Sequence, residues 1–160
     1  MRAWLLACLW VWMAGCAHAP HSGEDLLESV RTYHEGVRWQ RFPVAAGRVP
    51  PAQRDDFLQE RDQLSEDLRI TDYEVLRVRS TSEGRAEVEV KWTWFLDSDG
   101  RVKETRAVEH WERHGKVWLL VDERRARGET MPGLAEPPDD AGVPGGADAG
   151  ASDGALAPVP

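Results

Sequence analysis

The first half of the chain contains two stretches in which apolar residues recur at helical spacing. The first stretch is built on Leu26, Val30, Tyr33 and Val37. Intervals of three and four residues place these side chains on one face of a helix. Ser22 is the expected N-cap of this helix. His34 is expected to lie beside the apolar face, exposed to solvent.

This helix is expected to end between Trp39 and Phe42, where Pro43 closes it. The segment from Trp39 to Phe42 is then expected to pack onto the sheet, and the alternative is that it forms the rim of a pocket. A second helix is expected to begin at Pro50-Pro51, because proline is tolerated in the first turn. The apolar spacing is repeated there by Phe57, Arg61, Leu64 and Leu68.

From Asp72 onwards the apolar residues alternate with polar ones, which is the pattern of β-strands. Four strands are predicted, at residues 73–79, 85–96, 102–113 and 116–125. The second strand has the clearest alternation, with one face made of Ala86, Val88, Val90, Trp92, Trp94 and Leu96. Glycine-containing turn signatures separate the strands.

The last hairpin allows its register to be predicted. If His114-Gly115 forms a two-residue tip, counting back from it pairs Trp111 with Trp118, His110 with Leu119, and Val108 with Val121. The same count pairs Arg106 with Glu123 and Glu104 with Arg125. Opposite charges that face each other across strands favour this register.

Helices followed by antiparallel strands predict an α+β fold, in which amino-terminal helices pack on a curved, cone-like antiparallel sheet of about four strands. This order resembles the nuclear transport factor 2-like (cystatin-like) superfamily, in which an amino-terminal helix lies in the hollow of a curved sheet. The resemblance covers residues 23–125. It is carried by residues 33–42 (YHEGVRWQRF), 68–78 (LRITDYEVLRV), 111–113 and 117–123.

The domain is expected to span residues 22–128, after a signal peptide (1–15) and a tether (16–21). Residues 129–160 are rich in Pro, Gly, Ala and Asp, and we expect them to form a disordered acidic tail. The formal net charge is -8, and the tail contributes acids but no bases. The domain itself is nearly balanced, so nucleic acid is not expected as a partner.

The amino terminus has the pattern of a secretory signal. The basic Met1-Arg2 precedes an apolar run that is shorter than the ~20 residues of a membrane span. The run ends in Met13-Ala14-Gly15-Cys16, which resembles the lipobox of bacterial lipoproteins. The resemblance implies a diacylglyceryl group on the Cys16 sulfur, cleavage between Gly15 and Cys16, and acylation of the new amine by palmitate or a similar chain.

The residue that follows Cys16 is Ala17 rather than aspartate, which resembles lipoproteins sorted to the periplasmic face of the outer membrane rather than the inner membrane. Two alternatives remain for the signal. A cut after Ala17-His18-Ala19 would give simple secretion, although Pro20 disfavours it, and the apolar run could instead be a weak membrane anchor. The chain holds one other cysteine, Cys8, which leaves with the signal, so no disulfide is expected.

An aromatic set carries the candidate binding site. Tyr33, Trp92, Trp94, Trp111 and Trp118 either fill the core or line a pocket for an apolar or planar ligand. A cone filled by these side chains would leave no room for a ligand and would favour a role in protein interaction.

Catalytic candidates come from the superfamily resemblance. Its isomerase, cyclase and dehydratase members use an Asp or His in the cone as general base, which would point to Asp122 or His110 here. The alternative is that Asp122 faces water and that His110 packs beside Leu119. His110 and His114 have a metal-binding spacing that requires a helix, but His110 lies on a predicted strand and His114 at its turn, so their side chains should lie far apart. Neither a metal nor a cofactor is expected.

These observations favour a lipid-anchored, non-catalytic protein of the cell envelope that binds a partner protein or a small apolar ligand. An enzyme of the same superfamily is the alternative. Dimerisation through the outer face of the sheet is a further possibility, although Glu87, Glu89 and Lys91 on that face argue against an apolar interface.

Overall fold

The computed structural model describes residues 25–137. The helical elements are α1 (Leu26–Arg38), α2 (Phe42–Ala46), the 3-10 turn η1 (Pro51–Gln53) and α3 (Arg54–Leu64). The strands are β1 (Leu68–Ser82), β2 (Arg85–Leu96), β3 (Lys103–His114) and β4 (Val117–Gly128). Helices followed by strands confirm the predicted α+β class.

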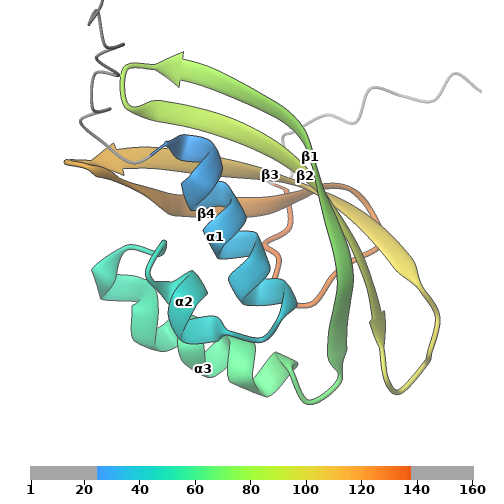
Figure 1. Cartoon of the computed structure of the whole chain (residues 1–160). Helices are drawn as coiled ribbons and strands as arrows, with labels where there is room; N and C mark the ends of the chain where they lie inside the picture. The colour runs from blue at the N-terminus through green and yellow to red at the C-terminus, as the bar shows by residue number, and fades with distance from the viewer. Residues whose placement is uncertain (1–24, 138–160) are drawn as a thin grey trace, which may run out of the picture.

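The strands form one antiparallel sheet in the order β1-β2-β3-β4. The sheet is strongly curved, and α1 contacts both of its edge strands, β1 and β4 (Figure 1). Because one helix touches both edges, the sheet wraps around α1. Helix α2 packs against α1, and α3 packs against α2.

Helix α1 begins at Asp25, whose side chain accepts a hydrogen bond from the Leu27 amide. The predicted cap Ser22 lies outside the described residues. The helix ends at Arg38 in a Schellman motif, where the Arg41 amide donates to the carbonyl of Gly36 and Gln40 adopts a left-handed φ of 54°.

The prediction that Pro43 closes this helix was wrong. The backbone already turns away at Gln40, and Pro43 lies in the first turn of α2, where its missing N–H costs nothing. The expected packing of Trp39 was also wrong, since its side chain is 59% exposed.

The prediction of strand bounds is confirmed most closely for β2, which spans the predicted residues. Its inward face is buried from Ala86 to Trp94, as the alternation indicated. Strand β1 is longer than predicted and includes Leu68, which the helical spacing had assigned to the second helix. The spacing of apolar residues could not show whether Leu68 belongs to the helix or to the strand, because an apolar residue suits either element. The pairing of Leu68 with Leu96 places it in the strand.

The predicted β3–β4 register was wrong by two residues. The tip of the hairpin is Gly115-Lys116, flanked by paired His114 and Val117, because Gly115 supplies the positive φ of 66° that such a turn needs at its first central position. Two irregularities then shift the register further. The resulting pairs are Trp111–Leu120, Arg113–Trp118, His110–Asp122, Val108–Arg124 and Arg106–Arg127.

The described chain continues past the predicted domain end. Met131 is 2% exposed and joins the core, while Ala135 bridges Arg124 in parallel. Arg125 binds the carboxylate of Glu136. The boundary predicted at Glu129 is therefore too early, because apolar and charged contacts hold residues 129–137 against the sheet.

The remaining tail, the signal peptide and Cys16 lie outside the described residues. Between residues 25 and 137, no helix combines the length and the apolar character required to cross a bilayer.

Candidate functional site

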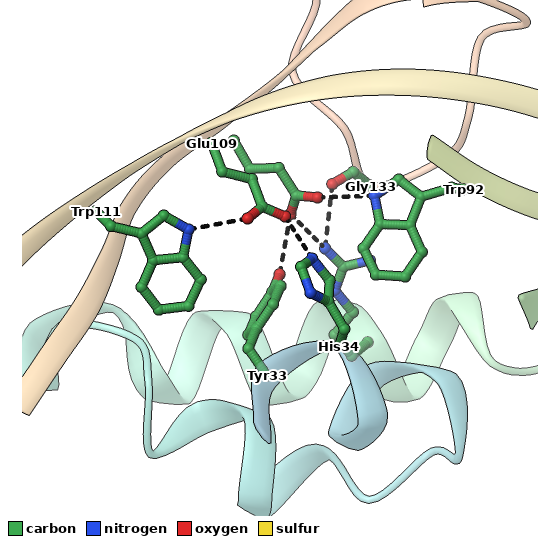
Figure 2. Close-up of polar contacts among 8 residues, drawn as sticks. Tyr33, His34, Trp92, Glu109, Trp111 and Gly133 are labelled. Atoms are coloured by element: carbon green, nitrogen blue, oxygen red, sulfur yellow. Dashed lines mark hydrogen bonds and ion pairs between the residues drawn. The ribbon is translucent and has the colours of Figure 1, made fainter. Parts of the chain in front are cut away.

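A cluster of polar side chains is buried between α1, α3 and the concave face of the sheet. The buried polar cluster consists of Tyr33, His34, Arg61, Trp92, Glu109, Trp111 and Glu123. Figure 2 shows the hydrogen bonds and ion pairs converging on its carboxylates. Buried carboxylates are costly unless hydrogen bonds and charges compensate them.

Glu109 is completely buried and both of its oxygens are paired. Its Oε1 lies 2.6 Å from His34 Nε2, and its Oε2 accepts a 2.8 Å hydrogen bond from Trp111 Nε1. His34 is also completely buried, stacked on Tyr73 with 4.8 Å between ring centroids and edge-on to Trp92 at 4.8 Å. Aromatic side chains therefore contact both members of the pair and fix their orientation.

Glu123 forms the second half of the cluster. Its Oε2 accepts a 2.9 Å hydrogen bond from the Tyr33 hydroxyl, and its Oε1 accepts a 3.1 Å hydrogen bond from Trp92 Nε1. Burial, followed by the neighbouring Glu109 carboxylate, raises the pKa of Glu123. Burial and the Glu123 carboxylate likewise raise the pKa of the Tyr33 hydroxyl well above its ordinary value.

Arg61 supplies the compensating positive charge. It is 6% exposed, lies 3.8 Å from Glu123 and donates a 3.4 Å hydrogen bond to the Gly133 carbonyl. Its position was visible in the sequence, because the apolar spacing of the second helix included it. Arg61 therefore ties α3 to β4 and to the segment after the last strand.

A pocket of about 260 Å³ opens beside this cluster. Its lining combines apolar side chains with acids: Tyr33, Val49, Gln53, Asp56, Phe57, Glu60, Arg61, Leu120, Val121, Asp122, Glu123 and Gly133. Of the buried polar cluster, Tyr33, Arg61 and Glu123 reach this pocket, whereas His34 and Glu109 lie behind them with no exposed surface.

The predicted aromatic pocket residues have a different role. Trp92, Trp94 and Trp111 are each at most 1% exposed and belong to the core, with Trp118 partly buried at its edge. Within residues 25–137, Tyr33 is the member of this set that lines the pocket described above. The space between α1 and the sheet is therefore filled by these aromatic side chains.

The catalytic candidates lie on the other face of the sheet. His110 Nδ1 is 3.4 Å from Asp122 Oδ2, and Arg124 Nε is 2.8 Å from the same oxygen. The His110 side chain is 49% exposed, because it alternates with the inward-facing Glu109 and Trp111. The two candidates therefore meet each other, and neither hydrogen-bonds to the buried polar cluster, although Asp122 contributes to the lining of the pocket beside it.

The sequence prediction for His34 was wrong, and the cluster around it was missed. Two signals could have found it. His34 follows Val30 by four residues and precedes Val37 by three, so it lies on the apolar face. Glu109 stands between Ala107 and Trp111 on the inward side of an alternating strand.

A metal site is not formed by this arrangement. Among the described residues, no group of three or more His, Cys, Asp or Glu side chains could hold a metal ion. The acids of the buried polar cluster are instead satisfied by a histidine, a tyrosine, two tryptophans and an arginine.

No protein-family model matches the sequence, and no curated protein matches it. Among solved structures, the chain is similar to a protein from Rhodopseudomonas palustris that contains a SEC-C motif, with a TM-score of 0.54 and 15% identity over 62% of this chain and 77% of that one. This likeness shows a shared fold.

Two further structures match with lower scores. A conserved protein from Planctomyces limnophilus matches with a TM-score of 0.45 and 18% identity, over 61% of this chain and 91% of that one. The hexachlorocyclohexane dehydrochlorinase LinA-type3 from Novosphingobium barchaimii matches with a TM-score of 0.49 and 13% identity, over 70% and 94%.

Proposed function

We propose that this chain is a lipid-anchored protein of the cell envelope whose nuclear transport factor 2-like domain binds a partner protein without catalysing a reaction. The order of the elements and the sheet that curves around α1 support the superfamily assignment. The lipobox ending in Cys16 supports the anchor.

The filled space between α1 and the sheet favours partner binding over ligand binding at that place. Tyr33, Trp92 and Trp94 are each 1% exposed, so an apolar ligand would have to displace core side chains. The enzymatic alternative has less support, because His110 and Asp122 pair on the outer face and the buried His34 and Glu109 have no exposed surface.

The observation that carries the proposal is an exposed tryptophan held in one orientation. Trp39 Nε1 donates a 2.6 Å hydrogen bond to Glu35, and the Arg38 guanidinium lies 5.0 Å from the centre of its ring. Glu35 is itself fixed by a 3.1 Å hydrogen bond from the Tyr73 hydroxyl. Tryptophan and arginine are enriched among the residues that dominate binding energy, and a side chain already ordered loses less entropy on binding.

The binding claim is tested by placing a photo-crosslinking residue at position 41, an exposed position two residues after Trp39, in the full chain in membranes. We expect one discrete adduct, and we expect Glu35→Ala to reduce its yield by releasing the ring. The matched control is Val102, a 68% exposed apolar residue in the β2–β3 turn, which should give no adduct. Equal adducts at both positions would contradict a specific surface.

The anchoring claim is tested separately. Cys16→Ser should release the chain from membranes and abolish its labelling by palmitate. The mass of the mature amino terminus provides a second measurement, because an unmodified chain that begins at Pro20 would contradict the lipoprotein assignment.

A further inference from the structure

Three basic residues lie in one row across the outer face of the sheet. Lys91 on β2 is paired with Arg106 on β3, and Arg106 is paired with Arg127 on β4. Like charges directly opposite each other on neighbouring strands are destabilising. Much of this face carries opposite charges in contact instead, such as Arg79 with Glu87 and Arg85 with Glu112.

The row borders a hollow of about 180 Å³. Its lining consists of Lys91, Glu104, Thr105, Arg106, Arg127 and Gly128. Three of these residues are basic and one is acidic. Gly128 has a φ of 94°, and a Cβ there would lie 2.5 Å from the Glu104 carbonyl oxygen. Glycine therefore lets β4 approach β3 closely at this end of the hollow.

The charges of the row are incompletely neutralised by the protein. Lys91 binds Glu74 at 2.8 Å and lies 4.0 Å from Glu104, and Arg106 is 3.7 Å from Glu89. The guanidinium of Arg127 makes no ion pair or hydrogen bond with any of the residues that the structure describes. An anion in the hollow could contact both arginines and remove their mutual repulsion.

We propose that this hollow binds a phosphate group. Two arginines that are cross-strand partners and line the same hollow match the oxygens of a phosphate, because arginine presents paired donors in a fixed plane. Lys91 would add a point charge at one end of the row. The phosphate could belong to a free anion or to the headgroup of an acidic phospholipid, and a protein anchored through Cys16 would meet both.

Equilibrium dialysis of labelled inorganic phosphate against the full chain in neutral detergent micelles tests the site. We expect saturable binding of one phosphate per chain at constant ionic strength. Arg106→Gln and Arg127→Gln should each weaken it by about tenfold or more, the loss expected when one charged hydrogen-bond donor is removed. Arg79→Gln, on the same face but outside the row, should leave it unchanged.

Adding phosphatidic acid to the micelles distinguishes the two sources. Competition with inorganic phosphate would identify the lipid headgroup as a ligand, and its absence would leave the free anion. Phosphate uptake that never saturates, or that falls equally in Arg79→Gln and Arg127→Gln, would overturn the proposal. The two row variants should keep the thermal unfolding midpoint of the unmodified chain or raise it, because each removes a like-charge contact, so lost binding could not be attributed to unfolding.

Discussion

Nε2 of His34 lies 2.6 Å from Oε1 of Glu109, and both side chains are completely buried. This pair joins α1 to β3, although the two residues are 75 positions apart in the sequence. A carboxylate in this position is tolerated because Trp111 occupies its second oxygen. The contact therefore orients α1 within the sheet as well as compensating a buried charge.

Glu109→Ala should lower the free energy of unfolding by about 3–5 kcal/mol, because it leaves the polar atoms of His34 and Trp111 buried without their partner. Urea titration followed by tryptophan fluorescence measures the change. Glu112→Ala is the matched control on the same strand. Its partners Arg85 and His114 are more than half exposed, so it should cost less than about 1 kcal/mol. Equal losses would refute a special role for the buried pair.

Gln40→Gly should stabilise the domain by about 0.5–1 kcal/mol, because residue 40 has a left-handed φ of 54° that glycine adopts without strain. Gln59→Gly makes the same replacement at an exposed position in the middle of α3. It should destabilise by about 1 kcal/mol, the ordinary cost of glycine in a helix. Thermal unfolding of both variants shows whether each change raises or lowers the stability of the domain. A loss of stability in Gln40→Gly would contradict the assigned C-cap.

Alkaline pH should destabilise the domain through Tyr33. Burial and Glu123 raise the pKa of Tyr33 in the folded state, so the unfolded chain loses this proton first, near about pH 10. The unfolded state then binds fewer protons, and stability falls as pH rises above that value. The chain has two tyrosines, which provides an internal control.

Tyr33→Phe should flatten this alkaline dependence of the unfolding free energy. Tyr73→Phe should flatten it less, since Tyr73 is more exposed and its pKa is raised to a smaller extent by burial and by Glu35. Denaturant titrations across the alkaline range measure the slopes, and identical slopes in the wild type and Tyr33→Phe would disprove the assignment.

Glu123 should make stability decrease as pH rises through the mildly acidic range. Burial and then Glu109 raise its folded pKa, so the folded state holds a proton that the unfolded chain releases from about pH 4.3 upwards. Glu123→Gln removes this titration. Its unfolding free energy, measured from about pH 4 to pH 8, should therefore rise relative to the wild type with increasing pH. A constant difference between the two would show that Glu123 does not titrate with a raised pKa.

Some features of the fold could be predicted from local sequence because they depend on period alone. The alternation from Ala86 to Trp94 determined which face of β2 is buried, since successive side chains of a strand point to opposite sides. The helical spacing of Tyr33 and Arg61 likewise predicted that both share the buried faces of their helices. Helices followed by an antiparallel meander then predicted an α+β class.

Only the tertiary structure determined which residues of different elements contact each other, because the spacing of apolar residues describes one element at a time. Residues distant in sequence, such as His34 and Glu109, become partners only when the sheet curves around α1, and the spacing of one element carries no information on the residue that faces it from another. The β3–β4 register depended on Gly115 in the turn and on two irregularities within the strands. The apolar spacing does not reveal where these irregularities occur. A polar residue on an inward position therefore signals that a partner exists, whereas the identity of that partner follows from packing in three dimensions.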